Sequence, residues 1–374
     1  MQTNTQGATG RPRRAANLPG LDYREQAARM SPPPFPITDI HLHINGPRAC
    51  RVYEEVSRLY GISRMLSQTR LADADQVRDV MGDRVSFVAV PNWSQPDRGR
   101  AFREDFLDHM RIWRDTYGAR VVKFWAAPRL WELVGGDPAD VVPLDSPWRI
   151  RAAELATELG MMFMAHVADP DTWFATKYAD ASKYRAKPDH YTGLERMLDR
   201  YTAPWIAAHM GGWPEDLAFL DGLLSRHPNL HLDTSATKWV VRALGQQPVE
   251  RVRAFFARWQ GRLLFGSDIV TLEDHMQPRS TPTPASPMSD LADSPESAFE
   301  LYASRYYTLR TMFETDYSGP SPIADPDLMM VEPDKYDDSA SPRLCGLKLP
   351  REQLRTLYAD AAENVVYRWI REHP

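Results

Sequence analysis

The chain has few cysteines, no long hydrophobic run and no large excess of one charge. Only Cys50 and Cys345 occur in 374 residues. They are too few for a disulfide framework or a cysteine-based zinc site, so a reducing compartment, the cytoplasm, is expected. No apolar stretch reaches the roughly 20 residues that cross a bilayer, which argues against a membrane partner. A net charge of −5 at pH 7 is typical neither of nucleic-acid-binding proteins nor of proteins that bind anionic membranes.

The first 30 residues have no periodic hydrophobic pattern. The pair Arg13–Arg14 is not followed by an apolar stretch, which argues against a secretory or twin-arginine signal. We therefore expect residues 1–30 to form a flexible leader that is closed by the proline-rich sequence SPPPFP at 31–36.

Eight strand-like segments alternate with helical patterns from residue 37 onward. Such alternation predicts right-handed crossovers and a parallel sheet. Eight units fit an α/β fold of the (β/α)8 TIM-barrel type, which needs about 250 residues. An open doubly wound sheet is the alternative, but the glycine-rich phosphate fingerprint that many such folds carry after the first strand is absent. The predicted strands are residues 37–43, 61–68, 84–93, 119–127, 161–167, 203–212, 229–236 and 262–268.

The sequence that follows the eighth predicted strand has a different composition. Residues 271–350 contain proline- and serine-rich stretches around a helical pattern at 295–317. An amphipathic helix is predicted at 349–370 and is expected to close the barrel. We therefore expect 271–350 to be a loop-plus-helix insert after the eighth strand, lying over the barrel mouth where active sites form.

Polar, metal-capable side chains recur at the predicted strand ends. In the first strand, ITDIHLH, alternate positions place Asp39, His41 and His43 on one face. Because all strands of a parallel barrel point the same way, strand-end side chains converge at one mouth. Several imidazoles and a carboxylate that converge in a cleft can bind a divalent ion and leave a coordination position open. Asp39 could orient one of the imidazoles. The later strands add Lys123, His166, His209 and Asp268.

This ordered set resembles the amidohydrolase superfamily. The motifs that carry the resemblance are DIHLH (39–43), a fifth-strand histidine in FMAH, AHMGG (208–212) and FGSD (265–268). The last two resemble the amidohydrolase-2 branch, which includes decarboxylases, lactonases and other hydrolases. The resemblance covers residues 37–270 and the last helix, and it implies a metal-dependent barrel over 31–374.

The resemblance also implies roles for individual residues. His41, His43, His166 and Asp268 would bind one Zn²⁺ or a similar ion such as Mn²⁺. His209 would act as acid/base or electrostatic catalyst, and Asp268 would also accept a proton. In binuclear members of the superfamily a fourth-strand lysine is carbamylated and bridges two metals, so Lys123 could serve a second ion; the alternative is a buried ammonium paired with a carboxylate.

Candidate substrate-binding residues lie mainly in the segment after the fifth strand. Its cations and aromatic side chains suit a small anionic or aromatic substrate, although a solvated charged loop would have the same composition. His231 and Asp233 share one face of the seventh strand, which makes Asp233 a further candidate for the site. The candidate substrate-binding residues are Trp125, Trp173, Lys177, Arg185 and His190.

Three functions are compatible with these residues. The first is a hydrolase that attacks an amide, ester or lactone carbonyl with metal-bound hydroxide. The second is a non-oxidative decarboxylase of an aromatic or enol carboxylate that uses the same metal. The third is a non-catalytic, metal-dependent binding protein. The sequence leaves the substrate, the identity of the metal and the oligomeric state, including a homodimer, open.

Overall fold

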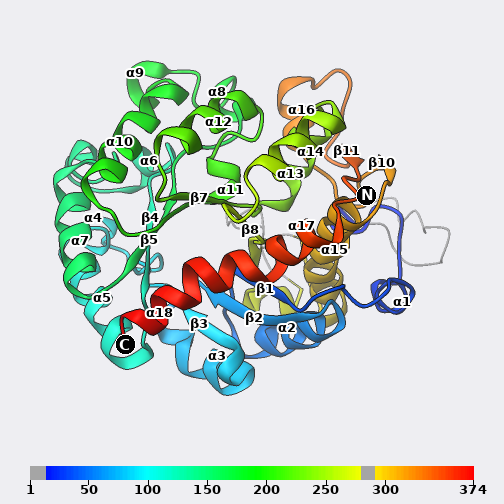
Figure 1. The fold of residues 1–374 in the computed structure, drawn as a ribbon, viewed down its shortest axis with the longest axis horizontal. Helices are drawn as coiled ribbons and strands as arrows, with labels where there is room; N and C mark the ends of the chain where they lie inside the picture. The colour runs from blue at the N-terminus through cyan, green and yellow to red at the C-terminus, as the bar shows by residue number, and fades with distance from the viewer. Residues whose placement is uncertain (1–13, 279–290) are drawn as a thin grey trace.

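The structure is a barrel of parallel strands that alternate with helices (Figure 1). It is a computed structural model that describes residues 14–278 and 291–374. The arrangement confirms the predicted (β/α)8 fold. The barrel strands are β1 (Ile37–His43), β2 (Ile62–Ser67), β3 (Val85–Phe87), β4 (Val121–Trp125), β5 (Met162–His166), β6 (Trp205–Ala207), β7 (Leu230–Asp233), β8 (Leu263–Leu264) and β9 (Ile269–Val270).

The barrel is closed by strand pairing at two places, between β3 and β4 and at the eighth strand. Between β3 and β4, Ala89 pairs in parallel with Val122. The predicted eighth strand is divided, because β8 pairs with β7 whereas β9 pairs with β1. The turn between β8 and β9 contains Asp268, whose φ of 59° lies in the left-handed region. The eighth strand therefore bends at the residue that was predicted to bind the metal.

Amphipathic helices form the outer ring and cover the apolar outer faces of the strands. Phe163 of β5 stacks on Trp205 of β6, and Phe124 of β4 meets Phe106 of α5. The segment between β3 and β4 forms two helices, a short α4 (Arg98–Ala101) and then α5. The ring consists of α2 (Pro47–Leu59), α3 (Ala74–Met81), α5 (Glu104–Tyr117), α7 (Pro147–Glu158), α10 (Lys187–Arg200), α12 (Leu217–Arg226), α14 (Val249–Arg258) and α15 (Pro295–Glu314).

Shorter elements decorate the two ends of the barrel. Most follow the carboxyl ends of strands, and α13 is a helix that the sequence reading did not predict. These elements are α6 (Leu130–Leu133), α8 (Asp171–Phe174), α9 (Ala181–Tyr184), α11 (Ala208–Gly211), α13 (Thr237–Gly245), β10 (Ser318–Pro320), α16 (Asp327–Val331), β11 (Arg343–Cys345), α17 (Arg351–Arg355) and α18 (Arg368–Glu372).

The eighth outer helix is α15, not the C-terminal helix that the sequence analysis assigned to this place. A loop-plus-helix segment does follow the eighth strand, as predicted. However, α15 packs against α2 and α13 and is almost wholly buried. Tyr306 reaches the barrel wall, where its ring stacks on Phe265. α15 is therefore part of the outer ring. The part nearer the mouth contains α16, whose Asp327 accepts a hydrogen bond from Trp173 of α8.

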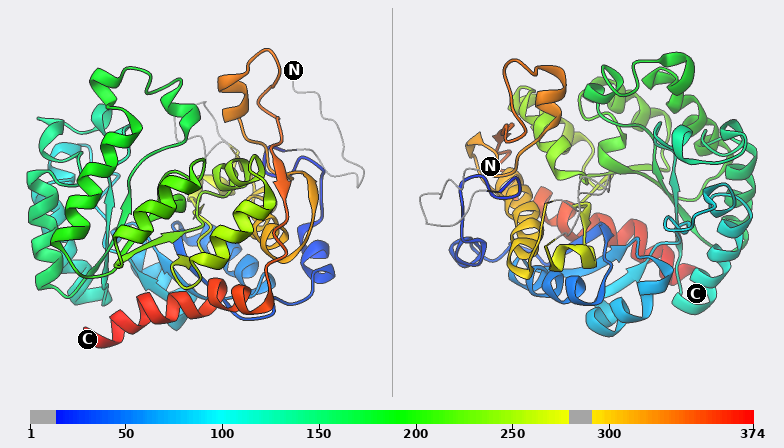
Figure 2. Two further views of the ribbon diagram at one scale, coloured as in Figure 1. Left: turned by 45° about the horizontal axis from the view of Figure 1, so that its top comes forward. Right: turned by 180° about the vertical axis from the view of Figure 1, so that it is seen from behind.

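The C-terminal helix crosses the opposite end of the barrel. Residues 351–372 run past the amino ends of the strands as one long rod, in which π-helical turns at 356–360 and 363–367 link α17 to α18 (Figure 2). Trp369 donates a hydrogen bond to the carbonyl of Gly160 just before β5, and Glu363 pairs with Arg64 of β2. The prediction that this helix completes the outer ring was therefore wrong, because it plugs the end of the barrel away from the site.

The described part of the predicted leader is packed against the barrel. Residues 1–13 lie outside the described residues. Further on, Ala16, Asn17 and Tyr23 are buried, and α1 (Tyr23–Arg29) packs on α15. Asp22 caps α1 by accepting hydrogen bonds from two backbone N–H groups. Residues 14–30 were expected to be flexible, but they instead bury apolar surface against α15.

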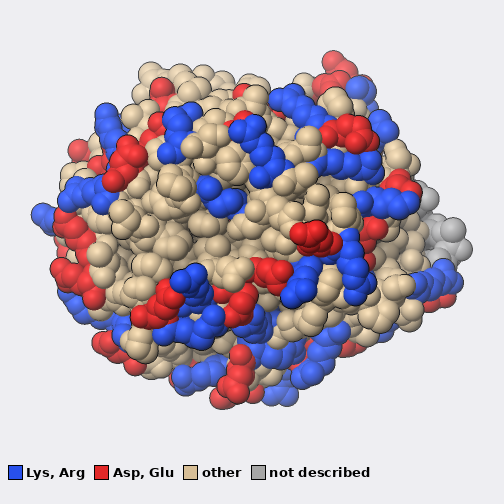
Figure 3. All heavy atoms as spheres, in the orientation of Figure 1, with Lys and Arg blue, Asp and Glu red and all other residues tan. Residues whose placement is uncertain are grey.

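The surface shows no extended region of one charge on the face in Figure 3. Basic and acidic side chains are interspersed, mostly around the periphery of this face. Within residues 14–278 and 291–374, no helix is both long enough and apolar enough to span a bilayer.

Candidate functional site

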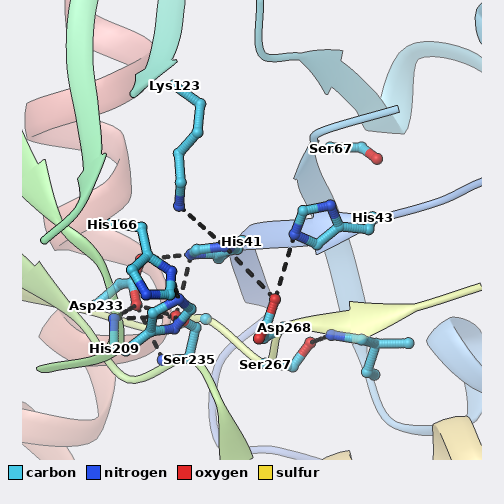
Figure 4. A network of polar contacts seen from close by, with 12 residues as sticks. His41, His43, Ser67, Lys123, His166, His209, Asp233, Ser235, Ser267 and Asp268 are labelled. Atoms are coloured by element: carbon cyan, nitrogen blue, oxygen red, sulfur yellow. Dashed lines mark hydrogen bonds and ion pairs between the residues drawn. The ribbon is translucent and has the colours of Figure 1, made fainter. Parts of the chain in front are cut away.

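Side chains from β1, β4, β5, β7 and the segments after β6, β7 and β8 meet at the carboxyl end of the barrel (Figure 4). Parallel strand pairing fixes the positions of these strands relative to one another. Lys123 of β4 pairs with Met164 of β5, and Met164 pairs with Ile206 of β6. The residues drawn together there are His41, His43, Lys123, His166, His209, Asp233, Ser235 and Asp268.

His41 is held in one orientation by Asp233. Its Nδ1 lies 2.8 Å from Oδ2 of Asp233, and both side chains are buried. A carboxylate only accepts, so Nδ1 carries the proton and Nε2 keeps a lone pair. This Nε2 lies 3.6 Å from Oδ1 of Asp268. A carboxylate that orients a histidine in this way is the usual partner of a metal-binding imidazole.

His43 and Asp268 form the open side of the site. Nε2 of His43 lies 3.3 Å from Oδ1 of Asp268, and these side chains are 25% and 27% exposed, whereas His41 is 1% exposed. Burial would raise the pKa of Asp268, but the hydrogen bond from His43 and the neighbouring imidazoles hold it well below its usual range. Asp268 is therefore a carboxylate at neutral pH, and a small molecule can approach it from this side.

Ser235 connects the two buried histidines to Asp233. Its Oγ lies against Oδ1 of Asp233, 3.0 Å from Nδ1 of His41 and 2.7 Å from Nδ1 of His209. Because the hydroxyl proton goes to the carboxylate, Oγ accepts from Nδ1–H of His209. The Nε2 atom of His209 is thereby left with a lone pair.

His166 and His209 present two acceptor nitrogens to each other. Nε2–H of His166 donates to Oδ1 of Asp169 at 2.9 Å, which leaves a lone pair on Nδ1. That Nδ1 lies 3.1 Å from Nε2 of His209. Burial, followed by the charge of His166, lowers the pKa of His209 well below its usual value. Two facing lone pairs at this distance repel unless a cation binds them, and this favours a metal near the pair.

Lys123 is buried among these groups. Its Nζ donates to Nε2 of His41 over a long 3.4 Å contact. Burial lowers the pKa of Lys123 to about 8, while the carboxylates of Asp233 and Asp268 act in the opposite direction. A lysine with a lowered pKa has a larger neutral fraction, which is the form that reacts with CO₂.

The backbone is strained around the site. His209, Met210, Ala236 and Asp268 have φ between 51° and 63°, which non-glycine residues rarely adopt. The left-handed turn at 209–210 follows β6 directly and brings the N–H of His209 to 2.9 Å from Oδ1 of Asp233. Strained backbone of this kind persists only where surrounding contacts maintain it, and it is found most often at functional sites.

Asp39 does not orient an imidazole, contrary to the sequence-based expectation. Its carboxylate accepts hydrogen bonds from the backbone N–H groups of His41 and Ser267 and from the hydroxyl of Tyr306. Burial raises the pKa of Asp39 to about 7. Asp39 instead ties β1 to the turn that contains Asp268, and Asp233 occupies the orienting position.

The predicted substrate-binding residues are spread around the mouth. The Trp125 ring lies 6.4 Å from that of His166. The ammonium of Lys177 lies 3.6 Å from the centre of the Trp173 ring. Arg185 and His190 line a small cavity together with residues that follow β4 and β5, such as Ala126 and Val167. The structure thus places Trp125 beside the histidines and the other four farther out.

Sequence reasoning missed Ser235 and Asp169. Both lie just past strand ends, in LDTSA and HVADP. Polar residues within three positions of a barrel strand end are the signal that could have identified them. Asp233 was considered in the sequence analysis, and it does contact the site.

Two overlapping groups could hold a metal among the described residues. One consists of His41, His209 and Asp233, and the other of His41, His43 and Asp268. Asp233 already accepts the proton of His41 Nδ1, so the first group would have to break that bond. The second group uses Nε2 of His41, whose lone pair faces Asp268 and Lys123 rather than Asp233, and its nitrogen and oxygen donors suit Zn²⁺. The residues therefore fit a divalent ion at His41, His43 and Asp268, and His166 lies next to this group, with its Nδ1 3.1 Å from Nε2 of His209.

Comparison with known proteins identifies the family. The profile of the amidohydrolase family matches residues 44–366. No curated protein matches the sequence significantly.

Among solved structures, organophosphorus hydrolase from Deinococcus radiodurans (a triple mutant) is similar, with 13% identity, 96% of each chain covered and a TM-score of 0.43. 2,6-Dihydroxybenzoate decarboxylase from Rhizobium has 14% identity and a TM-score of 0.39, with 71% of this chain and 98% of that chain covered. An amidohydrolase from Burkholderia multivorans with bound zinc has 12% identity and a TM-score of 0.42, with 88% and 98% covered. The profile match spans most of the sequence, and the chain belongs to the amidohydrolase family, in its amidohydrolase-2 branch.

Proposed function

We propose that this protein is a metal-dependent hydrolase that acts on an amide, ester or lactone carbonyl. The observation that carries the proposal is the convergence of His41 Nε2, His43 Nε2 and Asp268 Oδ1 at the open end of the barrel. These atoms and His166 would hold one divalent ion, Zn²⁺ or Mn²⁺. Such an ion polarises a carbonyl oxygen and makes a coordinated water more acidic.

The protein residues around this centre would move the proton. Asp268 is ionised, so it can accept the proton of the attacking water. His209 is neutral, and its Nε2 has a lone pair that can take up a proton. Once protonated, His209 can stabilise a developing negative charge or pass the proton to the leaving group. Asp233 and Ser235 keep His41 and His209 in the tautomers that these roles need.

The first test is the metal content. We expect the purified protein to contain about one divalent ion per chain, as a single site of this kind holds. Elemental analysis measures it. A folded and active preparation without metal would refute the proposal. Two ions per chain, together with activity that depends on bicarbonate during metal loading, would instead assign Lys123 as a carbamylated bridge between two metals.

Ser235→Ala tests the positioning of His209. The substitution removes the acceptor of Nδ1–H, so His209 can adopt the wrong tautomer. We expect turnover to fall about 10-fold, the kinetic equivalent of one neutral hydrogen bond, and the pH–rate profile to shift, with the metal content unchanged. Ser225→Ala on α12 is the matched control, because its exposed hydroxyl donates to the carbonyl of Asp221 and accepts from Arg258, neither of which belongs to the site. An unchanged rate and pH profile would contradict the assignment.

A non-oxidative decarboxylase is the second candidate. The same residues would hold the carboxylate of an aromatic or enol substrate, and His209 or Asp268 would deliver a proton to the carbon from which CO₂ leaves. Trp125 beside His166 favours this reading, because an indole can stack on an aromatic ring. Release of CO₂ from a panel of aromatic carboxylates, compared with hydrolysis of a lactone and ester panel, separates the two. A protein that binds metal and ligand but turns over neither panel would be a binding protein.

A further inference from the structure

Three of the four histidines at the site have a ring nitrogen that a neighbouring side chain holds. The pairs are His41 with Asp233, His166 with Asp169 and His209 with Ser235. His43 is different. Its Nε2 lies 3.3 Å from Oδ1 of Asp268, but its Nδ1 has no hydrogen-bond partner among the described residues. The orientation of the His43 ring is therefore fixed from one side only.

Binding of an ion at Nε2 would make the other nitrogen of His43 important. A neutral imidazole carries one ring proton, so coordination through Nε2 leaves that proton on Nδ1. Nδ1–H of His43 would then be a hydrogen-bond donor. Histidines that bind metals nearly always donate this second N–H to an acceptor, which fixes the ring and strengthens the ligand. His43 thus calls for an acceptor close to its Nδ1.

Gln68, the residue after β2, has a buried side-chain amide without a partner. The residue is 2% exposed, and within the described ranges neither its Nε2 nor its Oε1 forms a hydrogen bond. Its backbone is held, because its N–H donates to the carbonyl of Leu42 at 2.7 Å. A buried polar group without a partner destabilises the folded protein, and such a group in a native structure calls for an explanation.

Strand pairing places the side chain of Gln68 on the inner face of the barrel. Phe87 of β3 packs against Trp113 of α5 and therefore faces outward. Ser67 of β2 pairs with Phe87 and also with Leu42 of β1, so these three residues share the outer face. Because successive side chains of a strand alternate between its faces, the residue after Ser67 faces inward.

The pairing with β4 leads to the same assignment. Lys123 faces the site, where its ammonium contacts His41, so the preceding residue Val122 faces outward. Ala89 pairs with Val122, and Phe87 lies two residues before Ala89. Phe87 is therefore on the outer face by this route as well.

Gln68 and His43 are cross-strand neighbours on the inner face. Neighbouring strands lie about 4.8 Å apart, and a glutamine side chain can span this separation by rotating about its side-chain bonds. The N–H of Ile44 donates to Oγ of Ser67 at 3.0 Å, which keeps the ends of β1 and β2 together. Figure 4 shows Ser67, the residue before Gln68, on the side of the His43 ring away from Asp268.

We propose that Gln68 is a positioning residue, whose side-chain carbonyl accepts the Nδ1–H of His43 when an ion is bound at Nε2. The inference rests on the proposed function and adds a residue to its site. One hydrogen bond would provide a partner for two groups that have none within the part of the chain described. Gln68 would then hold His43 as Asp233 holds His41.

Gln68→Met tests this role, because methionine is similar in size and offers only a weak acceptor. We expect the affinity for zinc to fall about 10-fold or more, the usual scale for losing the partner of a metal-binding histidine. Competition with a chromophoric chelator measures the affinity on the full-length protein. Gln68→Glu keeps an acceptor at this position, so it should bind zinc at least as tightly as the unsubstituted protein.

The stability of the metal-free protein separates positioning from a structural role. Without an ion Gln68 has no side-chain hydrogen bond to lose, so Gln68→Met should leave the melting temperature unchanged or raise it. Gln247→Met is the matched control, because the amide of Gln247 donates to the carbonyl of Pro214 at 2.7 Å. The control should lower the melting temperature and leave the affinity for zinc unchanged.

Three outcomes would overturn the role of Gln68. They are an affinity of Gln68→Met for zinc within twofold of the unsubstituted protein, an equal loss in Gln68→Glu, and a metal-free melting temperature that Gln68→Met lowers as much as Gln247→Met does. Failure of the proposed function alone would appear as zinc-loaded protein without turnover, since zinc affinity is measured without a substrate. An unsubstituted protein that binds no zinc would overturn both.

Discussion

Asp268→Asn should reduce turnover by about 10³-fold or more and weaken metal binding. The change removes a proposed ligand and the proposed proton acceptor together, and loss of an acid–base group alone costs about 10²- to 10⁴-fold. Asparagine is the sharper variant, because Asp268 has a φ of 59° and asparagine tolerates this conformation better than alanine. Zinc content is measured by elemental analysis after dialysis against a weak chelator, and turnover on the substrate panels.

Asp216→Asn is the control for that experiment. Asp216 caps α12, and aspartate and asparagine are nearly equivalent as helix caps. The barrel should stay folded in both variants, because its packed interior and outer helices hold it together rather than the polar groups at strand ends. If Asp268→Asn kept full zinc content and full turnover, both roles of Asp268 would be wrong.

His209→Asn should separate chemistry from metal binding. We expect turnover to fall by about 10²-fold or more, the usual scale for losing an acid–base or oxyanion-stabilising group, while zinc remains near one per chain. Asparagine suits the left-handed backbone at this position, where φ is 58°, and it does not titrate. The affinity for zinc is measured by competition with a chromophoric chelator alongside the rate.

The comparison with His41→Asn makes the result interpretable. His41 Nε2 belongs to the group that fits the metal, so its loss should lower zinc content as well as turnover. His227→Asn, a histidine at the end of α12 that pairs with Asp199, is the control for histidine replacement in general. If His209→Asn lost zinc as completely as His41→Asn, His209 would be a ligand. Its facing lone pair with His166 at 3.1 Å would then be part of the metal site.

The role expected of each residue depends on how deeply its side chain is buried. His209 and Asp233 are inaccessible to solvent or nearly so, whereas His43 and Asp268 face the open side. Electrostatic interactions are stronger where water is excluded. The substrate would therefore meet His43 and Asp268 first, and His209 would act on it from the buried side of the cluster.

Local patterns in the sequence were sufficient to predict the barrel and the family. Strand and helix periodicity, with strand ends marked by His43, His166 and Asp268, depends on residues close together in the chain. The predicted (β/α)8 fold is confirmed, as is the resemblance to the amidohydrolase-2 branch. The missed helix α13 begins at a left-handed alanine without a capping side chain, so it lacks the usual start signal.

Only the tertiary structure decided which distant groups pair. The choice between α15 and the C-terminal helix as eighth outer helix depended on which one could bury its surface between α13 and α2, and both helices have suitable patterns. Asp233 rather than Asp39 orients the His41 ring, because β7 brings the Asp233 carboxylate to Nδ1, whereas Asp39 accepts from the backbone N–H of His41. Periodicity determines which face of an element is buried, but distances between side chains on different elements depend on how those elements pack together.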